Sequence, residues 1–342
     1  MSKIKVMVVD DSLLFREIII KGLEGDNEIE VVGFSADPFD AKDKIPKLAP
    51  DVMTLDIEMP KMDGIKFLRK LLPQYPLPVI VVSSLRESVF EALDAGAFDF
   101  IAKPDNVNGD ANSFLTELRA KILAASSAQY AFRRNQPETI ELTVEGLKTP
   151  VDPARIIAIG ASTGGTEAIN SILTKFSSNM PGIVIVQHMP PGFTQMYAQR
   201  LNTITNLQAK EAEDGDDVLP GRILIAPGDF HMELVRKGTG YAVKINKNPK
   251  VNGHRPSVDV LFDSVAKVAG KKALGVILTG MGADGATGLK RIRSVGGYTI
   301  GQDERSSVVY GMPMAAYMTG AVMAQLPLYR IADEICRILS ET

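Results

Sequence analysis

The chain is poor in cysteine: Cys336 is the only one among 342 residues, so no disulfide can form within the chain. Disulfides are typical of oxidising compartments, and we therefore expect a cytoplasmic protein. The sequence also lacks an excess of positive charge, because 38 Lys and Arg residues stand against 41 Asp and Glu residues, a formal net charge of −3. Without a basic field, nucleic acid is not an expected partner.

Long hydrophobic segments are missing as well. The apolar run before Asp10 is too short for the core of a signal peptide. Residues 306–329 carry no formal charge, but Pro313, Gln325 and Pro327 interrupt them. We interpret this stretch as a buried helix rather than a membrane span, and we expect no membrane insertion.

The length favours two domains. In residues 1–122, short β-branched runs each precede a segment with helical spacing, which predicts a parallel sheet with helices on both faces. The predicted strands are residues 5–9, 30–34, 52–55, 78–82 and 98–102.

Residues 123–152 are rich in Ala, Ser, Gln, Arg, Asn and Pro, and we interpret them as an interdomain linker whose start can continue the preceding helix. A second strand–helix alternation fills residues 153–342, and residues 241–245 alternate as half of an antiparallel hairpin would. The strands predicted for this α/β domain are residues 156–159, 183–187, 222–226, 273–278 and 297–300.

Polar side chains stand at the ends of the N-terminal strands. Asp10 and Asp11 follow the first strand, and Asp56 follows the third. The carboxyl ends of parallel strands share one edge, where three carboxylates need a hard cation such as Mg²⁺. Ser83 and Lys103 end the fourth and fifth strands, so this edge has the parts of a phosphoryl-transfer site. The alternative is a set of solvated loop acids with a surface lysine.

Residues 1–122 resemble bacterial response-regulator receiver domains, which have a flavodoxin-like (βα)5 fold. The resemblance implies that a chemotaxis histidine kinase phosphorylates Asp56, and that Ser83 and Lys103 contact the phosphoryl group. It also implies that Mg²⁺ binds Asp10, Asp11, Asp56 and the backbone carbonyl of Glu58. The segment between Ser83 and Lys103 is short for the family, which predicts a short fourth helix. The matching motifs are Val8-Val9-Asp10-Asp11-Ser12, Leu55-Asp56-Ile57-Glu58-Met59-Pro60, Val82-Ser83-Ser84 and Lys103-Pro104.

The second domain begins with a glycine-rich turn after its first strand. Gly160-Ala161-Ser162-Thr163-Gly164 fits G-x-S-x-G, a sharp strand-to-helix turn that exposes a nucleophilic serine. A dinucleotide-binding loop is the alternative, but the spacing is not G-x-G-x-x-G and no acidic residue ends the next strand.

His188 ends the second strand of this domain, and Asp284 follows a later strand, so both should lie on the sheet edge that carries Ser162. The three side chains would supply a nucleophile, a base and an orienting carboxylate. Their order differs from that of α/β-hydrolases. His231 and His254 are loop residues with no obvious route to Ser162. They either line a cleft or cap turns, and zinc is not expected.

The second domain resembles the chemotaxis protein-glutamate methylesterase family, whose fold is doubly wound and mostly parallel. The resemblance implies a cofactor-free catalytic triad of Ser162, His188 and Asp284, with oxyanion stabilisation by Thr163 and the Met281 backbone N–H. The implied substrates are methylated chemoreceptor cytoplasmic domains, with glutamine deamidation as a second activity and phosphorylation as the control. The matching segments are residues 160–167, 187–193, 255–259, 279–285 and 302–313.

Two other functions compete with this hypothesis. One is a receptor- or kinase-docking adaptor with a vestigial esterase site, and the other is a response regulator with a nucleotide-binding output. The presence of Ser162, His188 and Asp284 together argues against the first.

Overall fold

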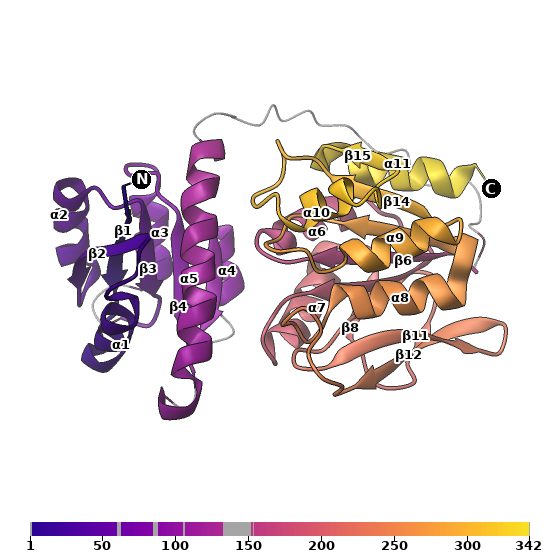
Figure 1. Cartoon of the computed structure of the whole chain (residues 1–342), viewed down its shortest axis with the longest axis horizontal. Coiled ribbons are helices and arrows are strands. Elements are labelled where there is room, and N and C mark those ends of the chain that lie inside the picture. The colour runs from indigo at the N-terminus through magenta and orange to yellow at the C-terminus, as the bar shows by residue number, and fades with distance from the viewer. Residues whose placement is uncertain are drawn as a thin grey trace. The chain divides into compact units, whose positions relative to one another are not determined.

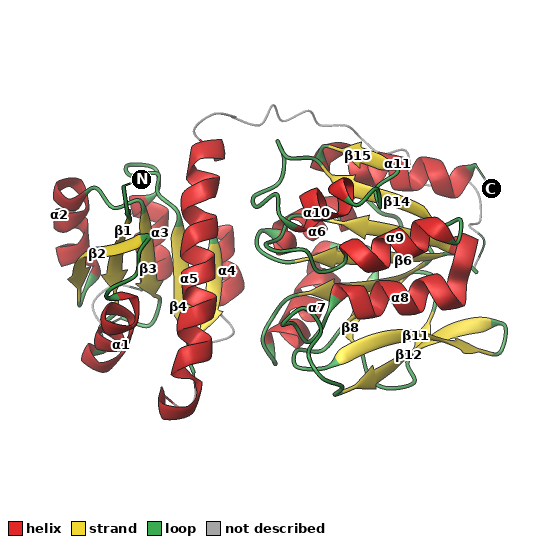
Figure 2. Ribbon diagram, viewed as in Figure 1, coloured by secondary structure: helices red, strands yellow, loops and turns green. Residues whose placement is uncertain are grey.

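The computed structural model describes residues 2–59, 63–84, 88–104, 107–132, 152 and 154–341. The chain divides into two compact units, Met1–Gln136 and Pro137–Thr342 (Figure 1). Each unit is an α/β layered fold with its own sheet (Figure 2).

The first unit is built on a five-stranded parallel sheet. The strand order β2-β1-β3-β4-β5 is that of flavodoxin-like folds, and it confirms the predicted fold class. All five predicted strands are present. The elements are β1 (Ile4–Val9), α1 (Leu13–Leu23), β2 (Ile29–Ser35), α2 (Pro38–Leu48), β3 (Val52–Asp56), α3 (Gly64–Leu71), β4 (Val79–Ser83), α4 (Val89–Asp94), β5 (Asp99–Ala102) and α5 (Val107–Phe132).

Local sequence explains where these helices begin and end. Helices α1, α2 and α3 each follow a residue whose side chain accepts a backbone N–H, namely Ser12, Asp37 and Asp63. Helix α4 has only six residues, as the short segment predicted. Residues 123–132 of the predicted linker form the end of α5, and residues 133–151 lie outside the described part of the chain.

The second unit is built on a seven-stranded parallel sheet in the order β15-β14-β13-β6-β7-β10-β8. A separate antiparallel sheet, β11-β12-β9, contains the predicted half-hairpin within β12. The elements are β6 (Ile156–Ala161), α6 (Gly165–Leu173), β7 (Gly182–Gln187), α7 (Phe193–Ile204), β8 (Gln208–Glu211), β9 (Asp217–Val218), β10 (Arg222–Ile225), β11 (His231–Lys237), β12 (Gly240–Asn246), α8 (Val258–Ala269), β13 (Ala273–Ile277), α9 (Ala286–Ser294), β14 (Tyr298–Gln302), α10 (Met312–Met318), β15 (Ala324–Leu326) and α11 (Leu328–Ser340).

The central strands β6 and β7 are buried along their whole length because helices cover both faces of the sheet. Helices α8 and α9 pack on one face, which Figure 1 shows toward the viewer, and the antiparallel sheet contributes to the same hydrophobic core. This arrangement leaves the carboxyl ends of β6, β7 and β13 as the edge where loops can build a site.

The prediction of one buried helix over residues 306–329 is wrong. Within it, Met312–Met318 forms the short helix α10, Ala324–Leu326 adds an edge strand to the sheet, and α11 begins at Leu328. Met312 and Ala316 are fully buried, but Tyr317 and Met318 of the same helix are exposed, so burial does not account for the low charge of the segment. Among the described helices, none is both long enough and apolar enough to cross a membrane.

Candidate active site and phosphorylation site

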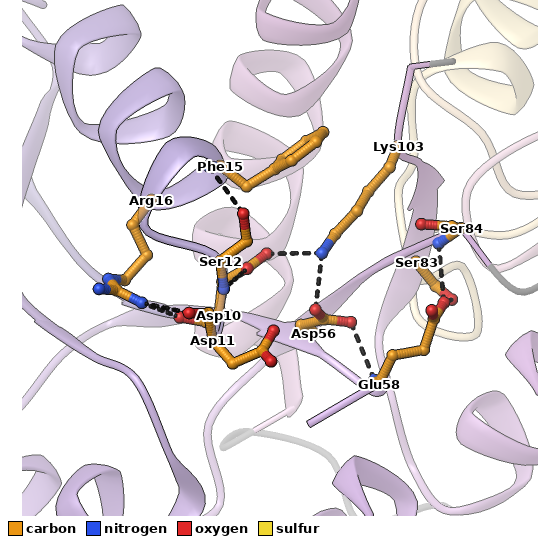
Figure 3. A network of polar contacts seen from close by, with 10 residues as sticks. All are labelled: Asp10, Asp11, Ser12, Phe15, Arg16, Asp56, Glu58, Ser83, Ser84 and Lys103. Atoms are coloured by element: carbon orange, nitrogen blue, oxygen red, sulfur yellow. Dashed lines mark hydrogen bonds and ion pairs between the residues drawn. The ribbon is translucent and has the colours of Figure 1, made fainter. Parts of the chain in front are cut away.

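The three predicted carboxylates of the first unit meet at one edge of its sheet. Val9 of β1 pairs with Leu55 of β3, so Asp10 and Asp56 leave neighbouring strands side by side. Carboxylate oxygens of Asp10, Asp11 and Asp56 all lie within 4.8 Å of one another (Figure 3). Burial, together with the nearby Asp56 charge, raises the pKa of Asp10 despite its contact with Lys103. Such a set of hard oxygen ligands fits a divalent cation.

Lys103 brings a positive charge to the same edge. Its Nζ lies 2.6 Å from Asp56 Oδ2 and 2.8 Å from Asp10 Oδ2 (Figure 3). Burial by itself lowers the pKa of Lys103, but the two carboxylates more than offset this and the pKa is raised. An ammonium is therefore held beside Asp56, where a transferred phosphoryl group would need charge neutralisation.

The side chain of Glu58 has a position that the sequence did not indicate. Its Oε1 accepts hydrogen bonds from the Ser83 hydroxyl and the Ser84 backbone N–H, each at 3.1 Å (Figure 3). Its own backbone N–H donates to Asp56 Oδ1 at 2.9 Å. From the sequence, only the backbone carbonyl of Glu58 was expected in the site, as a metal ligand. Nothing in the sequence indicates that the Glu58 side chain contacts the end of another strand. The carboxylate thus takes donors that a phosphoryl group on Asp56 would use.

Replacing Glu58 with alanine should therefore make the receiver accept a phosphoryl group or its mimic more readily. Hydrogen bonds to a charged group contribute about 1.5–3 kcal/mol, and losing the competition should raise the affinity for beryllofluoride about 10-fold. Calorimetric titration with Mg²⁺ present measures this, and Glu58→Gln is the matched control because it keeps an acceptor without the charge. Equal or weaker binding by Glu58→Ala would contradict the competition.

In the second unit, Ser162 and His188 directly follow the neighbouring strands β6 and β7. Ala161 of β6 pairs with Gln187 of β7, and the His188 N–H donates to the Ala161 carbonyl at 3.1 Å. Because Ala161 and Gln187 are paired, the residues that come after them, Ser162 and His188, leave the two strands at the same level of the sheet. Helix α6 begins three residues after Ser162, which places its positive end at this turn.

Glycines permit the close approach of two loops at this turn. The Ser162 N–H donates to the Thr279 carbonyl at 3.0 Å. A Cβ added to Gly280 would lie 2.8 Å from the Ser162 Cβ, so only glycine fits. Gly164 has a φ of +75°, and a Cβ there would lie 2.6 Å from Val308.

The imidazole of His188 meets the predicted carboxylate. Its Nε2 lies 2.9 Å from Asp284 Oδ2. Because a carboxylate only accepts, Nε2 carries the proton, and Nδ1 is left as a base. Nδ1 is buried without a hydrogen-bond partner among the described residues. The Ser162 hydroxyl is not hydrogen-bonded to His188 in this structure, and such bonds often form only when substrate binds.

Asp284 is held as an anion by a dense set of donors. Burial by itself raises its pKa, but hydrogen bonds, led by that from His188, more than offset this and hold the pKa well below its usual range. Two of the donors are the first backbone amides of α8, whose positive end faces the carboxylate. Besides His188, the donors are Asn252 Nδ2 (2.9 Å), the Ser257 hydroxyl (2.8 Å), the Val258 N–H (2.7 Å) and the Asp259 N–H (3.3 Å).

The sequence did not predict that Asn252 and Ser257 hold Asp284, and it left His254 open between lining a cleft and capping a turn. Both side chains donate hydrogen bonds to Asp284, and the ring of His254 stacks on that of His188 with 3.9 Å between centroids. His231 has another role, because its Nδ1 accepts the Ser257 N–H and its Nε2 binds the Pro249 carbonyl.

The predicted oxyanion residues lie on the two loops that meet at Ser162. Thr163 is buried, and Met281 is 41% exposed at the start of the loop leading to Asp284. The Thr279 hydroxyl ties these loops together by donating to the Thr163 carbonyl at 2.9 Å. Within the described part of the chain, neither the Thr163 nor the Met281 backbone N–H has a hydrogen-bond partner.

The fold and the two sites define a class of protein: a response regulator whose output domain is an α/β hydrolytic enzyme. Residues 6–109 match the response regulator receiver domain family, and residues 157–335 match the CheB methylesterase family. The chain belongs to the family of the protein-glutamate methylesterase/protein-glutamine glutaminases, which joins these two domains.

Named relatives match nearly the whole chain. Protein-glutamate methylesterase/protein-glutamine glutaminase 2 of Syntrophomonas wolfei is 54% identical over 99% of this chain and 98% of its own length. The Salmonella typhimurium protein of the same family is 46% identical over the same shares. The crystal structure of the Thermotoga maritima CheB methylesterase catalytic domain matches with 40% identity and a TM-score of 0.53, covering 54% of this chain and 98% of that one. The family predicted from the sequence is confirmed.

Proposed function

We propose that this chain hydrolyses glutamate methyl esters on chemoreceptor cytoplasmic domains, deamidates specific glutamines there, and is activated by phosphorylation of Asp56. The observation that carries the catalytic half is the 2.9 Å contact between His188 Nε2 and Asp284 Oδ2, one strand away from Ser162. The family names support the ester and amide substrates.

The chemistry follows from the protonation of His188. Ser162 Oγ attacks the ester carbonyl while its proton passes to His188 Nδ1, and the backbone N–H groups of Thr163 and Met281 stabilise the oxyanion. The imidazolium then gives that proton to the leaving oxygen or nitrogen as its bond to the acyl carbon breaks, so that an ester releases methanol and a glutamine releases ammonia. Water, activated by the same Nδ1, releases the acyl group as a glutamate carboxylate. Asp284 keeps the proton on Nε2 throughout.

The receiver half supplies the control. Mg²⁺ would be held by Asp10, Asp11, Asp56 and the Glu58 backbone carbonyl, and would neutralise charge on the phosphoryl group. Asp56 accepts the phosphoryl group from a chemotaxis histidine kinase, and Ser83 and Lys103 contact it. We place this reaction in the cytoplasm, where such a kinase and the receptor domains meet. Phosphorylation then relieves inhibition of the catalytic domain by the receiver.

Methanol release from a methylated receptor fragment tests both halves. With acetyl phosphate and Mg²⁺, the wild type should accelerate about 10-fold, within the usual range of coupling between two sites. Asp56→Asn should keep the unstimulated rate and lose the stimulation. Equal stimulation of the variant would remove the regulatory half and leave the hydrolase standing. A complete absence of methanol release from the wild type would instead favour the adaptor hypothesis.

A further inference from the structure

The catalytic imidazole packs face to face against a second histidine. The rings of His188 and His254 are almost parallel, with an interplanar angle of 8° and 3.9 Å between centroids. His188 follows β7, whereas His254 lies in the segment that leads into α8. Two imidazoles from distant parts of the chain are therefore in van der Waals contact over a whole ring face.

The hydrogen bond to Asp284 alone does not fix the plane of the His188 ring. A ring held at Nε2 can still tilt about that contact, and Nδ1 has no hydrogen-bond partner among the described residues to restrain it. Tilting would change the direction of the Nδ1 lone pair, and with it the alignment needed to take the proton of Ser162. Reacting groups must be held closely, because about 1 Å of misplacement can cost about 10²-fold in rate.

His254 is anchored independently of His188. Val251 and His254 exchange both backbone hydrogen bonds, at 3.1 and 2.9 Å. Between them, Asn252 Nδ2 bridges Asp284 Oδ1 at 2.9 Å and Asp259 Oδ2 at 2.8 Å. One short segment thus contacts the base through a ring and the carboxylate through an amide, so it can hold both in one relative position.

We propose that His254 is a positioning residue, whose stacked ring holds the imidazole plane of His188 so that Nε2 stays on Asp284 and Nδ1 faces Ser162. The proposal rests on the proposed esterase function and adds a residue to its machinery. The required property is a flat, uncharged ring. Burial, and then the proximity of His188, lower the pKa of His254 to about 4, with a smaller contribution from Lys250 and opposed by Asp284. At neutral pH the ring therefore adds no charge against the imidazolium that forms during catalysis.

Substitutions of His254 that keep or remove a flat ring, without its nitrogen atoms, test the proposal in the full chain. His254→Ala and His254→Leu should lower kcat for methanol release about 10–100-fold, while KM changes less than about 3-fold. His254→Phe keeps a flat, neutral ring and should recover most of the loss. Leu has about the volume of the imidazole, so it remains informative if the Ala variant does not fold.

The chain has only three histidines, so ¹⁵N spectra of the imidazoles give a readout that does not depend on turnover. His188 should remain the Nε2–H tautomer in every variant, because Asp284 fixes that proton. Its ring signals should be sharp in the wild type and in His254→Phe, and broadened in His254→Leu, where the ring samples several orientations. His231, whose Nδ1 accepts the Ser257 N–H, serves as an internal reference for an intact fold.

Two results would overturn the proposal: a Phe variant as impaired as the Leu variant, or a Leu variant as active as the wild type. Failure of the underlying function would look different. In that case the wild type itself would release no methanol, or Ser162→Ala would release it at the wild-type rate, whatever the behaviour of the His254 variants.

Discussion

Replacing Ser162 with alanine should abolish methanol release, lowering kcat by about 10⁶-fold, the loss typical of removing a serine nucleophile. The covalent route needs the hydroxyl of residue 162, and alanine has none. The Ser162 hydroxyl has no hydrogen-bond partner among the described residues, so its loss should change the free energy of unfolding by less than about 0.5 kcal/mol.

The comparison needs three measurements: methanol release, thermal unfolding and phosphorylation of Asp56. Unfolding and phosphorylation should match the wild type, because Ser162 belongs to the other unit of the chain. Replacing the exposed Ser340, in the last helix, is a matched serine-to-alanine control with full activity expected. If Ser162→Ala retained even one-tenth of the wild-type rate, Ser162 would not be the nucleophile.

Replacing Asp284 with asparagine should lower kcat about 10⁴-fold by a different route. The carboxylate only accepts, which fixes the proton of His188 on Nε2. An amide could present its NH₂ group to Nε2, favouring the tautomer whose proton sits on Nδ1. In that tautomer Nδ1 cannot take the Ser162 proton. The loss should appear in kcat more than in KM, since substrate binding does not require Asp284.

Asp284→Asn should also destabilise the catalytic domain. Both carboxylate oxygens already accept N–H or O–H donors, including the Ser257 hydroxyl and the Val258 N–H, so an NH₂ group faces a donor in either orientation. Each unsatisfied buried donor costs about 1–3 kcal/mol. Asp263→Asn is the control, because Asp263 lies in α8 and pairs with Arg291, whereas Asp284 pairs with His188. Asp263→Asn should keep its activity.

The pH dependence of this destabilisation has a definite sign. The pKa of Asp284 is lower in the folded chain than in the unfolded chain, where it is about 3.9. Its charge therefore stabilises the fold above about pH 4, and this contribution is lost as the pH falls through the folded pKa. The difference in unfolding free energy between wild type and Asp284→Asn should be largest near neutral pH and should shrink below about pH 4. A difference that grew on acidification would contradict the ionised role of Asp284.

Much of both sites could be predicted because a parallel sheet brings its strand ends to one edge. Knowing where the strands end was enough to bring Asp10, Asp56 and Lys103 together. The same was true of Ser162 and His188. The register of β6 on β7 then placed the last two beside each other. The position of a residue at the end of a strand does not depend on loop conformation, so the hydrophobic pattern of the sequence is enough to predict it.

The wrong secondary-structure predictions lie where the hydrophobic pattern of the sequence does not match the way the segment packs. The uncharged stretch at residues 306–329 has the composition of a helix, but its prolines and glycines divide it into loops, α10 and β15. Strand β8 escaped prediction because Gln208-Ala209-Lys210-Glu211 is polar, as an edge strand with one open side can be.

By itself, the sequence determined the two α/β domains, their order and the side chains at the strand ends, because hydrophobic periodicity is local and parallel strands share an edge. Only the tertiary structure decided how the loops close over those edges. The Glu58 carboxylate on Ser83, the Asn252 amide on Asp284 and the His254 ring on His188 are contacts between distant segments. Each contact depends on how a loop packs and on which hydrogen-bond donors remain unsatisfied once the core has formed. A short window of residues determines neither of these.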